Sequence, residues 1–287
     1  MLLNQLNQPD SSMKNIIVPT DLSAATDIAL SVAADIAQAQ NATVLLLHMV
    51  VQPIRSFAYT GTGSTAPDDL VRRYYDANKE AEAAIAKLVA QEKYRDKDIK
   101  YLLVEDSEGL IKELTEREAD LIVMHTRGSS GWEEFLLGSN AEAIVRNATC
   151  PVLVVRERVE NFKPEKVVRA LDLDERMKAR YDYPFPLSNQ EVPQWLYVMT
   201  PDNSRVPDGI RNWVHTFATE HGIDEYKFNI HEAKTVPEGI IEYAEDNGAD
   251  LIVLYTHGRK GLRHLFAGSV AEDVLNHSKI PVLVMRL

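Results

Sequence analysis

Two glycine-rich segments of this chain combine the residue types that bind phosphate groups. Each follows an apolar run and ends in a glycine and a serine; the residues are Gly128, Gly131, Gly138 and Ser139 in the first, and Gly258, Gly261, Gly268 and Ser269 in the second. Glycine has no Cβ, so backbone N–H groups can approach an oxyanion, and the start of a following helix adds partial positive charge. The pattern favours a nucleotide-type ligand in at least one segment. The alternative is that the glycines serve only tight packing between a strand and a helix.

The two segments belong to a long internal repeat. Residues 120–131 and 250–261 both read Asp-Leu-Ile-Val followed by the glycine pattern, and the offset stays at 130 residues (128 to 258, 151 to 281) as far as Pro151 and Pro281. A repeat this long that occurs twice indicates a duplicated domain and not a solenoid. The chain therefore offers the same loop in two places.

The length of 287 residues suits two domains of ordinary size. We expect a first domain at residues 13–156, a linker at residues 157–165 and a second domain at residues 166–287. Residues 1–12 lack the basic start and the apolar stretch of a secretory signal. Because strand-like sequence begins only after Met13, they are expected to form a disordered or peripheral extension.

Short apolar runs alternate with helical patterns in both halves. The expected strands are 15–21, 43–48, 100–104, 121–124, 152–155, 167–172, 195–200, 226–230, 251–255 and 282–285, and the expected helices are 28–36, 70–88, 107–118, 139–147, 209–220, 237–246 and 270–277. The expected buried stripe of the long helix is Leu70, Tyr74, Ala77, Ala81, Ala84 and Leu88. Strands that are apolar throughout indicate a parallel sheet covered on both faces. We predict an α/β fold of two tandem doubly wound domains, each with a five-stranded parallel sheet of order 3-2-1-4-5 and helices on both faces.

This strand order defines a crevice in each half. The chain reverses direction between the first and fourth strands, and ligands bind beyond the carboxyl ends of the strands at that point. Asp21 ends the first strand and Gly128 follows the fourth, and Asp172 and Gly258 take the same places in the second half. Each aspartate is therefore expected to face a glycine loop across one crevice.

The second half departs from the first after Asp172. Residues 181–186 read Tyr-Asp-Tyr-Pro-Phe-Pro, and each proline inside a helix would cost about 3 kcal/mol. We expect the first helix of the second half to be short or broken. Tyr181, Tyr183 and Phe185 would then form either an aromatic lid over the second crevice or an ordinary packing segment.

The composition narrows the possible partners. A net charge of −12 and a pI near 5.2 disfavour nonspecific binding to nucleic acid, and no apolar run is long enough to span a bilayer, so neither nucleic acid nor a membrane is an expected partner. Cys150 is expected to be a buried structural thiol, and a chain with one cysteine suits a reducing cytoplasm. The sequence shows no metal-ligand spacing and no signature of a nucleophile with its base, so we expect no metal site and no catalytic residues. His48 is expected to be a core histidine.

Together these motifs resemble the universal stress protein family in its tandem, two-domain form. The resemblance runs from Met13 to Leu287 and lies in Ile-Val-Pro-Thr-Asp21, Leu-Leu-Leu-His48-Met49, the repeated Asp-Leu-Ile-Val strands, the Gly-Ser loops and the Pro-Val-Leu-Val ends. It implies an adenine nucleotide, ATP or AMP with Mg²⁺, as the ligand. It also implies that the two domains pack as a pseudo-dimer through their last strands, here residues 151–155 and 281–285, and a homodimer of the chain is a further expectation.

The resemblance also implies a set of site residues. Carried over position by position, the nucleotide site of the family falls on Asp21, Met49, Gly128, Gly138 and Ser139 in the first half and on Asp172, Met199, Gly258, Gly268 and Ser269 in the second. In that pattern the aspartate and the residue after the second strand hold adenine and ribose. The first glycine of the family pattern is replaced by His125 and Tyr255, whose side chains are large enough to fill the ribose or phosphate space.

The two loops differ in charge. The first carries Glu133 and Glu134, which would repel a polyphosphate, and the second carries Arg259, Lys260, Arg263 and His264. Electrostatics therefore favours the second loop, whereas the intact Pro-Thr-Asp21 motif favours the first.

Three functions are consistent with these observations. The first hypothesis is a cytoplasmic stress-response or signalling protein, not an enzyme, that binds an adenine nucleotide in at least one domain. The second is an interaction or assembly module without a nucleotide, in which His125 and Tyr255 fill the crevices. The third is a slow ATP hydrolase, which only the analogy of fold supports.

Overall fold

The structure is a computed structural model. It describes residues 13–50, 68–104, 112–114, 117–126, 139–174, 183–185, 192–203, 205–256 and 270–286, without the side chains at positions 68, 70, 139, 140 and 142.

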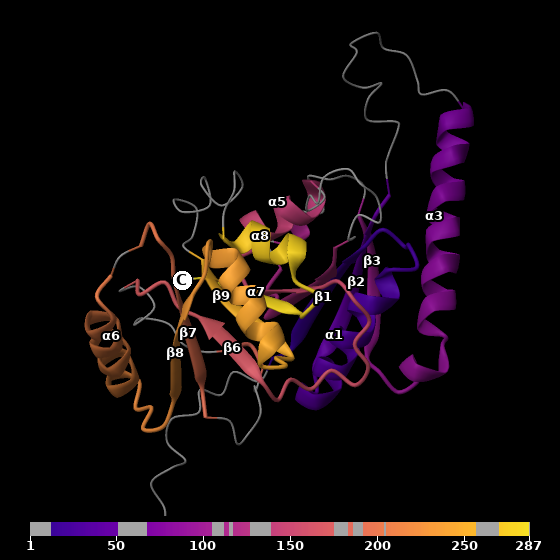
Figure 1. The fold of residues 1–287 in the computed structure, drawn as a ribbon. Helices are drawn as coiled ribbons and strands as arrows, with labels where there is room; N and C mark the ends of the chain where they lie inside the picture. The colour runs from indigo at the N-terminus through magenta and orange to yellow at the C-terminus, as the bar shows by residue number, and fades with distance from the viewer. Residues whose placement is uncertain are drawn as a thin grey trace, which may run out of the picture.

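The described strands form one sheet of ten strands (Figure 1). The strands are β1 Asn15–Thr20, β2 Thr43–Met49, β3 Ile99–Val104, β4 Leu121–His125, β5 Val152–Val155, β6 Val167–Ala170, β7 Gln194–Met199, β8 Lys227–Glu232, β9 Leu251–Thr256 and β10 Val282–Arg286. Their order is β3-β2-β1-β4-β5-β10-β9-β6-β7-β8. Within each half all neighbouring strands are parallel and follow the order 3-2-1-4-5, so the predicted fold class is confirmed.

Helices cover both faces of this sheet. They are α1 Thr26–Gln40, α3 Asp68–Val89, the short 3-10 helix η1 Glu92–Tyr94, α5 Ser139–Asn147, α6 Pro207–Glu220, α7 Val236–Asp246 and α8 Val270–His277. Successive side chains of a strand point to opposite faces, so Ile16 packs with α1 and Ile17 with α5. On this basis α1, α3, η1 and α6 lie on one face, and α5, α7 and α8 share one apolar layer on the other. Figure 1 shows α3 and α6 at opposite ends of the sheet.

Two helices differ from the prediction. In α3, Ala81 and Ile85 are buried whereas Ala77 and Ala84 are exposed, so the predicted stripe is wrong at two alanines. An alanine side chain carries little apolar surface, and the larger Ile85 decides which way the helix turns. Of the predicted helix 107–118, residues 112–114 are helical, residues 117–118 are not, and the rest lies outside the described residues.

The two halves join through their last strands. β5 and β10 pair antiparallel, with Leu153 opposite Leu283, which confirms the contact that the family resemblance implies. Two arginines at equivalent positions reinforce this pairing. Arg156 donates to the carbonyl of Asn276 in α8, and Arg286 donates to the carbonyl of Ala148 after α5. Each guanidinium thus meets a helix end of the other half, where free carbonyls and the helix dipole favour a cation.

The repeated aspartate of the Asp-Leu-Ile-Val motif has a structural role in both halves. One carboxylate oxygen of Asp120, and likewise of Asp250, accepts two backbone hydrogen bonds from the residues at the start of the first strand of its half. The donors are Lys14 and Asn15 for Asp120, at 2.7 and 2.9 Å, and Glu165 and Lys166 for Asp250, at 3.0 and 2.9 Å. This contact ties the first strand to the fourth at the end remote from the crevice.

The close approach of α7 to β7 gives a test of the packing. A Cβ on Gly239 would lie 2.6 Å from Cγ1 of Val198 and 2.7 Å from Cβ of Ala233, whereas a Cβ on Gly209 in α6 would meet nothing in the described part of the chain within 4 Å. Alanine favours a helix over glycine by up to about 1 kcal/mol, but forced overpacking costs about 1–3 kcal/mol. We expect Gly239→Ala to lower the free energy of unfolding and the matched Gly209→Ala to raise it. Urea unfolding followed by circular dichroism measures both, and a stabilised Gly239→Ala variant would contradict this packing.

Candidate functional site

The carboxyl ends of β1 and β4 lie side by side, as the predicted strand order requires. Ile16 pairs with Leu121, and five residues further along each strand the chain reaches Asp21 and Thr126. Both residues therefore stand just beyond the ends of adjacent parallel strands, where ligands of such sheets bind.

The second half repeats this arrangement. Val167 pairs with Leu251, and five residues further along are Asp172 and Thr256. The two predicted aspartates thus occupy equivalent positions, each beside the end of the fourth strand of its half.

The glycine loops themselves fall outside the described residues. These are the predicted phosphate-binding residues Gly128, Gly138, Gly258, Gly268 and Ser269. Ser139 is the first residue of α5, and its side chain is not described. The approach of each aspartate to its glycine loop therefore stays a prediction.

Both aspartates start the same tight turn. An oxygen of Asp21 accepts from the N–H of Ser23 at 2.9 Å, and an oxygen of Asp172 accepts from the N–H of Asp174 at 3.0 Å. The next residue in each turn, Leu22 or Leu173, has a left-handed backbone with φ of 59°. This conformation costs a non-glycine residue roughly 1–2 kcal/mol. The apolar side chains of both leucines pack on the core, which explains why glycine does not stand there.

A polar network supports this turn in the first half. The Thr20 hydroxyl lies 2.5 Å from the Thr26 hydroxyl and accepts from the N–H of Leu22 at 2.9 Å. Nδ1 of His48 donates to the Thr20 carbonyl at 2.9 Å, since a carbonyl can only accept. The half-buried His48 therefore positions the end of β1 and is not a fully buried core histidine. The second half has Leu171 in place of Thr20 and lacks this network.

The predicted residues after the second strand, Met49 and Met199, are not equivalent. The strand registers place Met49 level with Asp21, and Val198 level with Asp172. Met49 and Val198 both pack on the face covered by α5 and α7, whereas Met199 packs on the opposite face with α6. The counterpart of Met49 is therefore Val198, one residue before the predicted position.

His125 and Tyr255 stand at the ends of β4 and β9, and both are half-buried. The Tyr255 hydroxyl lies 2.8 Å from the hydroxyl of Tyr183, which also accepts from Nε of Arg169 at 2.8 Å. Arg169 is only 3% exposed. Arg169 was not among the predicted site residues, and its one signal in the sequence is a charge inside the apolar run 167–171.

The threonines at the ends of β4 and β9 differ in their hydrogen bonding. Thr126 is 5% exposed, and its hydroxyl has no hydrogen-bond partner within the described part of the chain. The equivalent Thr256 is 6% exposed and donates to the Met285 carbonyl at 3.4 Å. Among the described residues, this unsatisfied hydroxyl at the strand ends is found in the first half and not in the second. Burying a hydroxyl without a partner costs about 1–3 kcal/mol.

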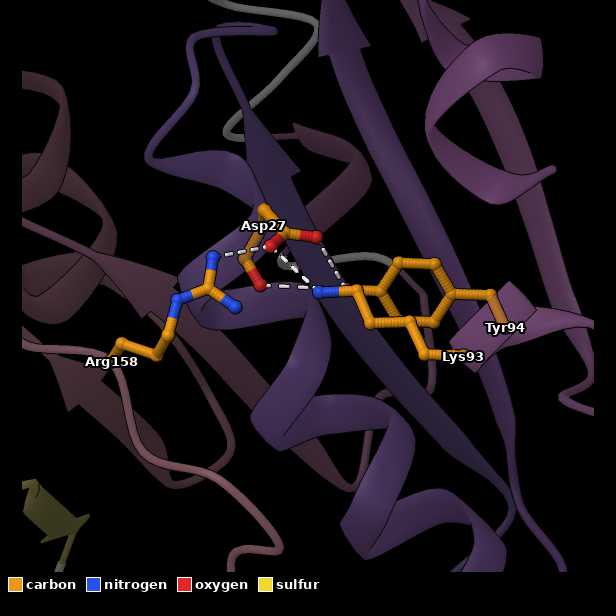
Figure 2. A network of polar contacts seen from close by, with 4 residues as sticks. All are labelled: Asp27, Lys93, Tyr94 and Arg158. Atoms are coloured by element: carbon orange, nitrogen blue, oxygen red, sulfur yellow. Dashed lines mark hydrogen bonds and ion pairs between the residues drawn. The ribbon is translucent and has the colours of Figure 1, made fainter. Parts of the chain in front are cut away.

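The start of α1, next to the Asp21 turn, is fixed by a charged network to the segment between β5 and β6, which contains the predicted linker (Figure 2). Asp27 accepts from Nζ of Lys93 at 2.7 Å, from the hydroxyl of Tyr94 at 2.8 Å and from the Arg158 guanidinium of the linker at 2.6 Å. Burial alone would raise the pKa of Asp27, but these hydrogen bonds outweigh it and hold that pKa below its ordinary value. Further along α1, Asp35 accepts from the backbone N–H of linker residue Phe162 at 2.8 Å.

Comparison with known proteins identifies the family. The model of the universal stress protein family matches residues 13–156 and 212–286. The chain belongs to the universal stress protein family. It is 26% identical over 183 residues to universal stress protein Slr1230 of Synechocystis sp., a match that covers 58% of each chain and so less than two thirds of that protein. It is 32% identical over 145 residues to universal stress protein MJ0531 of Methanocaldococcus jannaschii, covering 50% of this chain and 82% of that one.

Solved structures of the family share the tandem architecture. A universal stress protein from Archaeoglobus fulgidus aligns with a TM-score of 0.71 at 19% identity and covers 97% of this chain and 99% of its own. A universal stress protein from Pseudomonas aeruginosa aligns with a TM-score of 0.62, also at 19% identity, over 96% of this chain. At this identity the likeness concerns the fold.

Within the described ranges of this universal stress protein, no three His, Cys, Asp or Glu side chains are placed to hold a metal ion. No helix in those ranges is both long and apolar enough for a membrane span. Cys150 is half-buried and not fully buried as predicted, but the burial of its thiol raises the pKa to about 12, so it stays protonated at neutral pH.

The Asp27 network predicts a pH-dependent stability. Because the folded-state pKa of Asp27 lies below its ordinary value of 3.8, its contribution is present above that pH and is lost as the pH falls through the folded-state pKa. We expect Asp27→Asn to lower the free energy of unfolding by about 1–3 kcal/mol at pH 7, and the difference from wild type to shrink as the pH falls below 3.8.

Urea unfolding between pH 3 and pH 7 measures this difference. Asp69→Asn is the matched control, since Asp69 and Arg73 form an exposed pair at 3.9 Å, which should contribute less than about 0.5 kcal/mol. If Asp27→Asn lowered the free energy of unfolding by the same amount at every pH, the charged network would be contradicted.

Proposed function

We propose that this universal stress protein binds an adenine nucleotide, ATP or AMP, beyond the carboxyl ends of the first and fourth strands in at least one half. Its role would be in the stress response of the cytoplasm, where occupancy of the site changes its conformation or its choice of partner. Family membership, the adjacent ends of β1 and β4, and the glycine loops of the sequence support the proposal.

The observation that carries the proposal is the buried hydroxyl of Thr126. It lies at the end of β4, level with Asp21, and has no hydrogen-bond partner in the described residues. Proteins seldom leave a buried hydroxyl unsatisfied, because the lost interaction with water is not replaced. A ribose hydroxyl or a phosphate oxygen at the strand ends would supply the missing partner.

The roles proposed for the other site residues follow the pattern of the family. Asp21 or Asp172 and the residue after the second strand would hold adenine and ribose. The phosphates would lie on the backbone of the glycine loops and the start of the next helix; these residues are Gly128, Gly138, Ser139, Gly258, Gly268 and Ser269. Mg²⁺ would then be held mainly by the phosphates. We propose no enzymatic turnover beyond slow hydrolysis of ATP.

A second function, that of an assembly module without a nucleotide, is favoured by one observation. Tyr255 is hydrogen-bonded to Tyr183, so in the second half protein side chains approach the place of the family's first glycine. A nucleotide that co-purifies with the protein, identified by mass spectrometry after denaturation, would exclude this function for the chain as a whole.

Thermal unfolding with ATP or AMP, with and without Mg²⁺, tests the nucleotide proposal. A ligand at 100 times its dissociation constant should add about 2.7 kcal/mol of stability. We expect Thr126→Val to keep or raise the stability of the free protein and to weaken nucleotide binding about 3- to 10-fold, as one lost hydrogen bond predicts. Thr256→Val is the matched control, because that hydroxyl already has a protein partner. The proposal fails if neither nucleotide stabilises the wild-type protein at millimolar concentration.

A further inference from the structure

Three side chains of the second half meet above the ends of β6 and β9. Arg169 of β6 donates to the Tyr183 hydroxyl, and this hydroxyl in turn lies 2.8 Å from the Tyr255 hydroxyl of β9. The Arg169 guanidinium carbon is also 5.3 Å from the centre of the Tyr183 ring. We call these three residues the Arg–Tyr–Tyr cluster.

The strand register places this cluster at the crevice. Arg169 pairs with Val253, two residues before Tyr255, so Arg169 and Tyr255 project from the same face of adjacent strands. Asp172 begins its turn just beyond the end of β6. The cluster therefore extends from the buried core up to the strand ends where the second ligand site is predicted.

The first half has different residues at the same positions. Val18 and His125 stand where Arg169 and Tyr255 stand in the second half, and helix α1 covers this face. In the second half the described residues 183–185 are not helical, in agreement with the prediction from the two prolines.

Tyr183 and Phe185 fill the place that a helix would cover. Phe185 is buried and packs on Phe162 of the linker with ring centres 6.3 Å apart. Phe185 thus packs in the core, as the packing interpretation expects, whereas the half-buried Tyr183 contacts both the core and Tyr255, and Tyr181 lies outside the described residues. The non-helical backbone of residues 183–185 carries Tyr183, whose hydroxyl meets that of Tyr255.

A ligand could enter this space only by separating the cluster. It would have to replace the hydrogen bond between Tyr183 and Tyr255. It would also have to give new hydrogen-bond partners to the guanidinium of Arg169, a residue that is only 3% exposed. Groups buried in a low-dielectric interior lose most when their partners are removed. At the end of β9, Thr256 also has its own protein partner, unlike Thr126 in the first half.

We infer that the Arg–Tyr–Tyr cluster occupies the second crevice in place of a ligand, so that the chain binds one nucleotide, in the first half. This inference rests on the proposed function and assigns it to the site of Asp21 and Thr126. It also means that the cationic second loop does not decide which half binds.

The stoichiometry of ATP binding tests the inference. Isothermal titration calorimetry of the full chain, freed of bound nucleotide, should give one ATP per chain, and Asp21→Ala should lose it. Two ATP per chain, or loss of binding in Asp172→Ala with retention in Asp21→Ala, would overturn the inference while the proposed function stands. No binding by the wild-type chain would instead remove the proposed function itself.

Opening the second crevice is the sharper test. Tyr255→Gly restores the family's first glycine and releases Tyr183. This variant should therefore bind two ATP per chain instead of one. Adding Asp172→Ala to it should return the number to one. His125→Gly, the same change at the equivalent position, should keep one ATP per chain. A folded Tyr255→Gly protein that still binds one ATP would overturn the inference. If this variant does not fold, the wild-type stoichiometry and the two aspartate variants decide.

Discussion

The antiparallel pairing of β5 with β10 is the contact on which the rest of the structure depends. It turns two five-stranded sheets into one and lets α5, α7 and α8 share a single apolar layer. Arg156 and Arg286 reinforce it from either side. Because the strands of each half are parallel among themselves and the halves meet antiparallel, the carboxyl ends of β1 and of β6 lie at opposite edges of the sheet. The two crevices are therefore separate sites, and no single ligand can contact both.

The two halves keep the same framework but differ in what lies at the crevice. Both retain the aspartate turn with a left-handed leucine and the aspartate that ties the first strand to the fourth. The first half adds the Thr20 and His48 network and leaves Thr126 unsatisfied. In the second half the described residues 183–185 are not helical, and a buried arginine and two tyrosines lie at the crevice. Duplication thus preserved the parts that hold the strands and changed the parts that a ligand would contact.

Much of the fold could be predicted, because apolar runs and the repeat at a constant spacing of 130 residues can be recognised in the sequence itself. The strand order and the contact between halves followed from the repeat and the family resemblance. Details that depend on long-range contacts could not be predicted. The buried side of α3 depends on how Ile85 packs against the sheet. That Val198, and not Met199, is the counterpart of Met49 depends on the register between β6 and β7. The only local signal for the buried Arg169 is its place inside an apolar run, and the strained leucines have none, because neighbouring elements impose their conformation. At the site, the sequence located both aspartates at the strand ends, and the glycine loops opposite them fall outside the described residues.

The central pairing also limits how this protein can assemble further. β5 and β10 each have a neighbour on both sides, so neither offers a free backbone edge to another molecule. The outermost strands of the sheet are β3 and β8, with quite different sequences. A second copy of the chain would therefore have to dock through a surface other than β5 and β10, and each protomer would already contain its own pairing of two halves.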